Sequence, residues 1–169
     1  EITEFYREHK DIILKPLYGH GGRAILHLKA DDDNFNTLTE MFFANSSEPI
    51  IAQRFLPEVK NEDKRIILVN GEIAGAIGRV PEANSIRANM RVGGKAIIVE
   101  LSKKQYEICE ALRQPLKDKG LIFVGLDVIG DWLTEINITS PTGLRAINKL
   151  SGTHLERNIW DAIESKLLV

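Results

Sequence analysis

One stretch, GLDVIGDWLTEINITSPT from Gly125 to Thr142, is the part around which the rest of the chain is organised. Apolar residues alternate with polar ones on both sides of a break at Gly130-Asp131. Such alternation is typical of half-buried β-strands, and a Gly-Asp pair between two alternating runs is typical of a tight turn. The stretch therefore predicts a β-hairpin.

The register of this hairpin determines which polar side chains meet. Because side chains alternate along a strand, Glu135 and Asn137 share one face of the second strand. A two-residue loop would place Asp127 of the first strand opposite Thr134, on the wrong face from Glu135. A three-residue loop, Gly130 to Trp132, or a bulge would place Asp127 directly across from Glu135, with side chains about 5 Å apart. We predict the three-residue loop.

In that register the hairpin presents two carboxylates and one amide carbonyl, from Asp127, Glu135 and Asn137. Oxygen ligands of this kind suit magnesium held on a phosphate. The alternative is a solvated polar face of an ordinary hairpin, and the spacing alone favours neither interpretation.

The bulk composition indicates a globular protein. Its 169 residues are enough for one domain with a substantial core, and 43% of them are hydrophobic and 27% charged. The net charge of −2 gives no basis for binding to nucleic acid or to a membrane. A single cysteine, Cys109, excludes an internal disulfide framework, and no apolar run approaches the roughly 20 residues that span a bilayer. We expect a cytoplasmic location.

A glycine-rich segment, Leu17 to Gly22, lies between two strand-like runs, Asp11 to Lys15 and Arg23 to Leu28. This order excludes a P-loop and a dinucleotide fingerprint, because both motifs lead into a helix. Backbone N–H groups at glycines can still approach phosphate oxygens closely, since no Cβ intervenes. The alternative is a plain turn, which is the more frequent reason for such a segment.

The other expected elements are regular. Asn70-Gly71 predicts a hairpin between Lys64–Val69 and Glu72–Val80, and Ser102 opens a helix with a capping box. Further helices are expected near residues 1–9, 34–44, 144–150 and 154–168, and a strand near residues 50–55. The four histidines, His9, His20, His27 and His154, show no metal-ligand spacing.

The segment from Pro81 to Lys95 loses its hydrophobic periodicity and gathers cations, among them Arg87 and Arg91, with Arg79 just before it. A long segment without structure of its own is often functional. An arginine can bind a carboxylate or phosphoryl group through two parallel hydrogen bonds. A basic surface loop would look the same in sequence.

Several segments occur in the order found in the ATP-grasp ligases, and the chain resembles the bacterial glutathione synthetases among them. The segments are Ile13–Leu17 with Gly19, Gly21 and Gly22, then Asp63–Arg65, Arg87–Asn89, Lys119–Asp127 and Thr134–Thr142. The resemblance runs from about Asp11 to Leu168. The acidic hairpin alone would indicate only an ATP-grasp ligase, and the continuation Thr-Ser-Pro-Thr from Thr139 favours this family.

The resemblance implies an α+β ATP-grasp fold, with antiparallel β-sheets flanked by helices. It implies one ATP-grasp domain over residues 1–169, with a nucleotide-lid subdomain at about 11–54 and a catalytic subdomain at about 55–169. Members of the family carry an N-terminal substrate domain, and this chain opens without a methionine. We therefore expect a piece of a longer protein that is a homotetramer, and we expect slow turnover or none from the piece alone.

The resemblance also implies a role for individual residues. Contacts to ATP fall on Lys15, Gly19, Gly21, Gly22, Gln53, Phe55, Leu56 and Asp63. The ligands of magnesium (or manganese) fall on Asp127, Glu135 and Asn137. Arg65 and Arg79 match catalytic arginines that bind the transferring phosphate, and substrate contacts fall on Arg87, Asn89, Asn137, Ser140 and Thr142. The chain departs from the family at Tyr18, where Asp is usual, and at Arg54-Phe55, where Asn-Tyr is usual.

The implied reaction joins γ-glutamylcysteine and glycine into glutathione, with ATP converted to ADP and phosphate through an acyl phosphate. One alternative is another ATP-grasp carboxylate–amine ligase with a different acceptor. An alternative of another class is a non-catalytic ATP-binding module, which the complete acidic cluster disfavours. No side-chain nucleophile is needed for this chemistry, and the sequence suggests none.

Overall fold

The computed structural model of the chain describes residues 1–18, 21, 23–44, 48–82 and 94–168. It divides into two compact units, Glu1–Pro57 and Glu58–Val169. The assignment of a nucleotide-lid and a catalytic subdomain to such parts of the chain stays a prediction.

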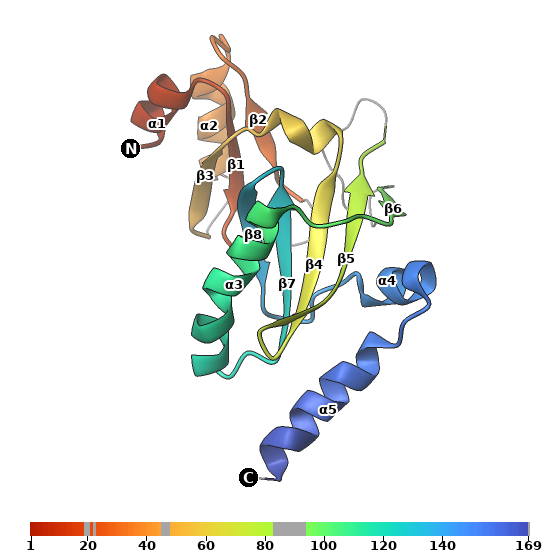
Figure 1. Ribbon diagram of the computed structural model, residues 1–169. Helices are drawn as coiled ribbons and strands as arrows, with labels where there is room; N and C mark the ends of the chain where they lie inside the picture. The colour runs from red at the N-terminus through yellow and green to blue at the C-terminus, as the bar shows by residue number, and fades with distance from the viewer. Residues whose placement is uncertain (19–20, 22, 45–47, 83–93, 169) are drawn as a thin grey trace. The chain divides into compact units, whose positions relative to one another are not determined.

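The first unit is a three-stranded antiparallel sheet with two helices (Figure 1). Its elements are α1 (Ile2–His9), β1 (Ile12–Pro16), β2 (Leu26–Leu28), α2 (Phe35–Ala44) and β3 (Ile50–Arg54). The strand order is β2-β1-β3, so the glycine-rich segment does join two antiparallel strands, as predicted. Alternate residues Ile12 and Leu14 of β1 are fully buried, and together with Leu28 they pack against Phe35 and other side chains of α1 and α2.

The second unit is a five-stranded antiparallel sheet of order β6-β5-β4-β7-β8 (Figure 1). Its strands are β4 (Asp63–Val69), β5 (Glu72–Val80), β6 (Lys95–Ile97), β7 (Phe123–Ile129) and β8 (Trp132–Asn137). Its helices are α3 (Lys103–Asp118), α4 (Leu144–Ser151) and α5 (Leu155–Leu167), and a 3-10 turn spans Pro57–Lys60. The predicted capping box at Ser102 and the hairpin at Asn70-Gly71 are both confirmed.

Helices cover both faces of this sheet. Ile66 and Leu68 of β4 point to one face, where they pack with Cys109 and Leu116 of α3. Ile67 and Val69 point to the other, where they pack with residues of α4 and α5. Because β4 is central and buried on both faces, its apolar residues run continuously from Ile66 to Val69. Asp63 and Arg65 come before these apolar residues on β4 and point to the sheet face that α4 and α5 cover. Charged side chains therefore lie at one end of that face.

No helix among the described residues is both long and apolar enough to cross a membrane.

Cys109 is expected to be nearly unreactive while the chain is folded. It is 2% exposed, and burial raises the pKa of its thiol from the ordinary 9.0 to about 11. Since the thiolate is the reacting form, alkylation by iodoacetamide at neutral pH should be at least about 100-fold slower in the native protein than in denaturing urea. Mass spectrometry of the alkylated chain over time measures both rates. Equal rates would contradict the burial of this thiol.

Candidate active site

The hairpin of β7 and β8 brings the predicted acidic residues together. Asp127 pairs with Glu135 across the two strands, and Gly125 pairs with Asn137, as the predicted register requires. The predicted three-residue loop is wrong, however, because Trp132 pairs with Ile129 and leaves a two-residue turn. A β-bulge supplies the extra residue instead.

The bulge lies at Thr134. Val128 pairs with Leu133 and Asp127 with Glu135, so Thr134 is one residue more than β7 can match. The Thr134 hydroxyl donates a hydrogen bond of 3.1 Å to the backbone carbonyl of Asp127, which holds the bulge in place. An extra residue in one strand switches the faces of everything beyond it. Glu135 and Asn137 are thereby turned onto the same face as Asp127.

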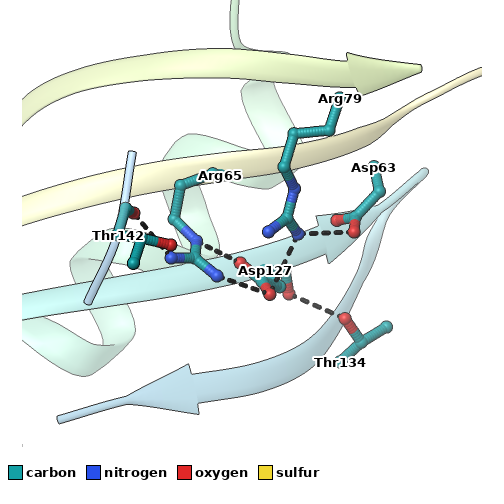
Figure 2. Close-up of polar contacts among 6 residues, drawn as sticks. All are labelled: Asp63, Arg65, Arg79, Asp127, Thr134 and Thr142. Carbon is teal, nitrogen blue, oxygen red and sulfur yellow. Dashed lines mark hydrogen bonds and ion pairs between the residues drawn. The ribbon is translucent and has the colours of Figure 1, made fainter. Parts of the chain in front are cut away.

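Asp127 is held by two buried arginines (Figure 2). Arg65, opposite it on β4, donates from Nε to Oδ1 at 2.5 Å and from NH2 to Oδ2 at 2.9 Å. Nη2 of Arg79 on β5 lies 2.9 Å from Oδ2 of Asp127 and 2.5 Å from Oδ2 of Asp63. The result is a network of acidic and basic side chains in the order Asp63–Arg79–Asp127–Arg65, which lies across three neighbouring strands. All four residues are 9% exposed or less.

Arg65 also fixes the segment that follows β8. Its NH1 donates to the carbonyl of Thr142 at 2.7 Å (Figure 2). Pro141 packs so closely on β7 that a Cβ added at Gly125 would lie 2.8 Å from the Cβ of Pro141. Gly125 is therefore the residue that lets the Ser-Pro-Thr segment reach the arginine. Of the two predicted substrate residues in that segment, both Ser140 and Thr142 are exposed.

The charges of this network shift the pKa values of its members. Burial would raise the pKa of Asp127, but the hydrogen bonds from Arg65 and the charge of Arg79 hold it below its ordinary value. Burial raises the pKa of Asp63 to about 7, with Arg79 acting in the opposite direction. Burial would lower the pKa of Arg79, and the charges of Asp127 and Asp63 raise it instead.

The donor set fits a cation that is held in part by another ligand. An ionised carboxylate can accept about four hydrogen bonds or metal contacts, and arginines take three of these positions on Asp127. The side-chain amide of Asn137 has a buried Nδ2 atom with no hydrogen-bond partner among the described residues. An asparagine amide also carries an oxygen, which is a ligand type that magnesium accepts.

The composition of the set also indicates which cation it suits. Three carboxylates, from Asp63, Asp127 and Glu135, interact electrostatically with two guanidiniums, and the group carries an excess of negative charge once Asp63, whose pKa burial raises to about 7, is ionised. Among the described residues no three histidine, cysteine, aspartate or glutamate side chains gather as a metal site. A magnesium ion held by two carboxylates and one amide would take its remaining ligands from phosphate or water oxygens.

The structure places the other predicted site residues as follows. Lys15 and Gln53 lie on β1 and β3 of the first unit, on the sheet face opposite the apolar core, and Phe55 and Leu56 follow β3. Gly21 has a positive φ of 69°, which glycine adopts without strain. Asp63 is paired with Arg79, and no pattern in the sequence predicts that pair. Gly19, Gly22, Arg87 and Asn89 lie outside the described residues.

Comparison of the fold with solved structures identifies its class. The chain is similar to a D-cycloserine synthetase, DcsG, with a TM-score of 0.71 and 14% identity over 98% of this chain and 60% of that one. It is also similar to a D-alanine–D-alanine ligase from Bacillus anthracis, with a TM-score of 0.68 and 17% identity over 99% of this chain and 58% of that one. The predicted α+β ATP-grasp fold is confirmed.

The sequence comparison is more specific. The model of the "Prokaryotic glutathione synthetase, ATP-grasp domain" family matches residues 1–152, and the chain belongs to this family. Over 166 residues it is 52% identical to a glutathione synthetase of Rhodopseudomonas palustris and 51% identical to one of Agrobacterium fabrum, covering 98% of this chain in both cases. It covers 53% and 52% of those relatives, so the chain spans about half the length of the curated relatives it matches.

Proposed function

We propose that this chain supplies the nucleotide-binding and phosphoryl-transfer part of a glutathione synthetase. The observation that carries the proposal is the pairing of Asp127 with Glu135 beside two buried arginines, in a chain of this family. In this proposal Lys15 and the glycines Gly19, Gly21 and Gly22 contact the phosphates of ATP, and Gln53, Phe55 and Leu56 contact its adenine.

Asp127, Glu135 and Asn137 would hold magnesium, or manganese in its place. When bound, the metal neutralises charge on the nucleotide phosphates. The buried arginines keep Asp127 ionised and fixed, because its pKa is lowered by Arg65 and Arg79 against the effect of burial. The carboxylate is thus ready to accept a cation without a change of protonation.

The proposed reaction begins with the cysteinyl carboxylate of γ-glutamylcysteine, which attacks the γ-phosphorus of ATP. The bond from that phosphorus to the bridging oxygen breaks, ADP leaves, and an acyl phosphate forms. The amine of glycine then attacks the acyl carbon, loses a proton and displaces inorganic phosphate. Phosphorylation is needed because a free carboxylate is a poor electrophile, and phosphoryl transfer depends mainly on positioning and charge neutralisation.

In this proposal Arg65 assists both steps. Its contacts to Asp127 and to the Thr142 carbonyl use three of the five N–H donors of the guanidinium within the described part of the chain. The other two can bind oxygens of the transferring phosphate. Ser140, Thr142, Arg87 and Asn89 would contact the peptide substrate and glycine. Family membership further supports a cytoplasmic location and a homotetrameric full-length protein.

Calorimetry of Mg-ATP binding tests the proposal. We expect the wild-type chain to bind ATP with a dependence on magnesium, and Glu135→Ala to weaken that binding by at least about 10-fold, since it removes a metal ligand. Glu164→Ala is the matched control, because it removes an exposed glutamate on α5. Binding that is equally strong with and without magnesium would contradict the metal assignment. An assay of ADP release by a chain as long as the curated relatives, with γ-glutamylcysteine and glycine, then tests ligase activity.

A further inference from the structure

The three-stranded sheet of the first unit has one face that its core does not use. Ile12, Leu14 and Leu28 point to the core face, under α1 and α2. The alternating residues point the other way, and the register places His27, Ile13 and Gln53 in one row across β2, β1 and β3. Lys15 lies one row further along the same face, opposite Ile51. His27 therefore shares a face with two residues that the proposed function assigns to ATP.

His27 is also fixed by two contacts. Its Nε2 lies 2.5 Å from Oδ1 of Asp11, a hydrogen bond in which the ring N–H donates to the carboxylate. Its ring stacks on Phe55, with ring centroids 4.0 Å apart and planes 24° from parallel. The His27 side chain is 16% exposed as a result. Both contacts link positions that are far apart in the sequence.

Asp11 closes this arrangement from the backbone side. The N–H of Phe55 donates to the Asp11 carbonyl at 2.9 Å, while the Asp11 side chain holds the imidazole. Phe55 is thus held twice, through its backbone by Asp11 and through its ring by His27. Since β3 ends at Arg54, the residues that follow it have no strand pairing within the described part of the chain.

We propose that His27, held by Asp11, is a positioning residue for the nucleotide segment, defined as Gln53 to Leu56. This inference rests on the proposed function, in which that segment binds adenine. A segment that is ordered before binding loses less conformational entropy when the base binds, so its fixation raises affinity for the base. His27 acts through Phe55 and need not contact ATP.

The test compares Mg-ATP with magnesium tripolyphosphate, which has the phosphates and no base. Calorimetry should give a Kd for Mg-ATP about 10-fold higher in His27→Ala than in the wild type, and an unchanged Kd for tripolyphosphate. His27→Phe keeps the stacked ring and should bind Mg-ATP within about 3-fold of the wild type. His154→Ala, which removes an exposed histidine of the second unit, should leave both values unchanged.

Asp11→Asn provides a milder second variant if His27→Ala does not fold. It keeps the Asp11 carbonyl and should raise the Kd for Mg-ATP about 3-fold without affecting tripolyphosphate. An unchanged Kd for Mg-ATP in His27→Ala and Asp11→Asn, with normal binding by the wild type, would overturn this inference alone. An equal loss for ATP and tripolyphosphate would also overturn it, because the role would then be general stability. No binding of Mg-ATP by the wild type would overturn the proposed function and this inference together.

Discussion

Replacing Asp127 by asparagine is expected to lower the free energy of unfolding by about 3–5 kcal/mol, which is the usual loss when one partner of a buried ion pair is removed. The change keeps the volume of the side chain and removes its charge. Arg65 and Arg79 are 4% and 2% exposed, and both donate to this carboxylate. Without it, two buried guanidiniums would lose the carboxylate that both of them contact, although Asp63 would still pair with Arg79.

Urea unfolding followed by tryptophan fluorescence measures this loss. Asp161→Asn is the matched control, since Asp161 is exposed on α5 and its replacement should change stability by less than about 0.5 kcal/mol. If Asp127→Asn unfolds at the same urea concentration as the wild type, the carboxylate does not neutralise the arginines in the way described. Because Asp127 is also a proposed metal ligand, the same variant should lose magnesium-dependent ATP binding.

The sequence predicted the elements of the site better than the details of their pairing. Alternation on both sides of Gly130-Asp131 predicted the β7–β8 hairpin, and side-chain parity showed that Asp127 and Glu135 meet only if one strand carries an odd residue. The predicted register of this hairpin is confirmed, and the predicted three-residue loop is wrong. The odd residue is Thr134, an ordinary strand residue, and nothing in its type distinguishes a bulge from regular pairing.

The same limitation explains why the pair Asp63–Arg79 was not foreseen. Pairing near the Asn70-Gly71 turn matches Val69 with Glu72, and continued without a shift it would place Gly78 opposite Asp63. A register shift between Ile67 and Leu68 pairs Arg79 with Asp63 instead. Each hairpin of the site therefore has a two-residue turn followed by a bulge in its second strand. The ion pairs of the site join residues on different strands, so local sequence patterns do not contain them.

The stacking of His27 on Phe55 has a similar origin. No metal-ligand spacing marks His27, and its partners lie 16 positions before it and in the segment after β3. Only the strand order β2-β1-β3 brings the three segments together. His27, Ile13 and Gln53 point to the same face of the sheet, but this can be deduced from the sequence only after the strand register is known.

Asp63 is expected to make stability fall as the pH rises from about 4 to 7. Burial raises the pKa of its carboxyl from the ordinary 3.8 to about 7. A carboxyl whose pKa is higher in the folded chain stabilises the fold while it is protonated, so this contribution is complete below pH 3.8 and is lost as the pH rises through 7. At 1.36 kcal/mol for each pKa unit, the loss is about 4 kcal/mol at most.

Asp63→Asn cannot ionise and should lack this loss. The quantity to measure is the difference in the free energy of unfolding between wild type and Asp63→Asn, obtained from urea unfolding at several pH values.

Asp127 has the opposite effect, because its lowered pKa makes stability fall as the solution becomes more acidic than pH 3.8. Its contribution is present in both proteins and largely cancels in the difference. As the pH rises between the two pKa values of Asp63, the free energy of unfolding of the wild type should therefore fall relative to that of Asp63→Asn by roughly 1.4 kcal/mol per pH unit. Parallel curves for the wild type and Asp63→Asn would mean that Arg79 outweighs burial and keeps Asp63 ionised throughout.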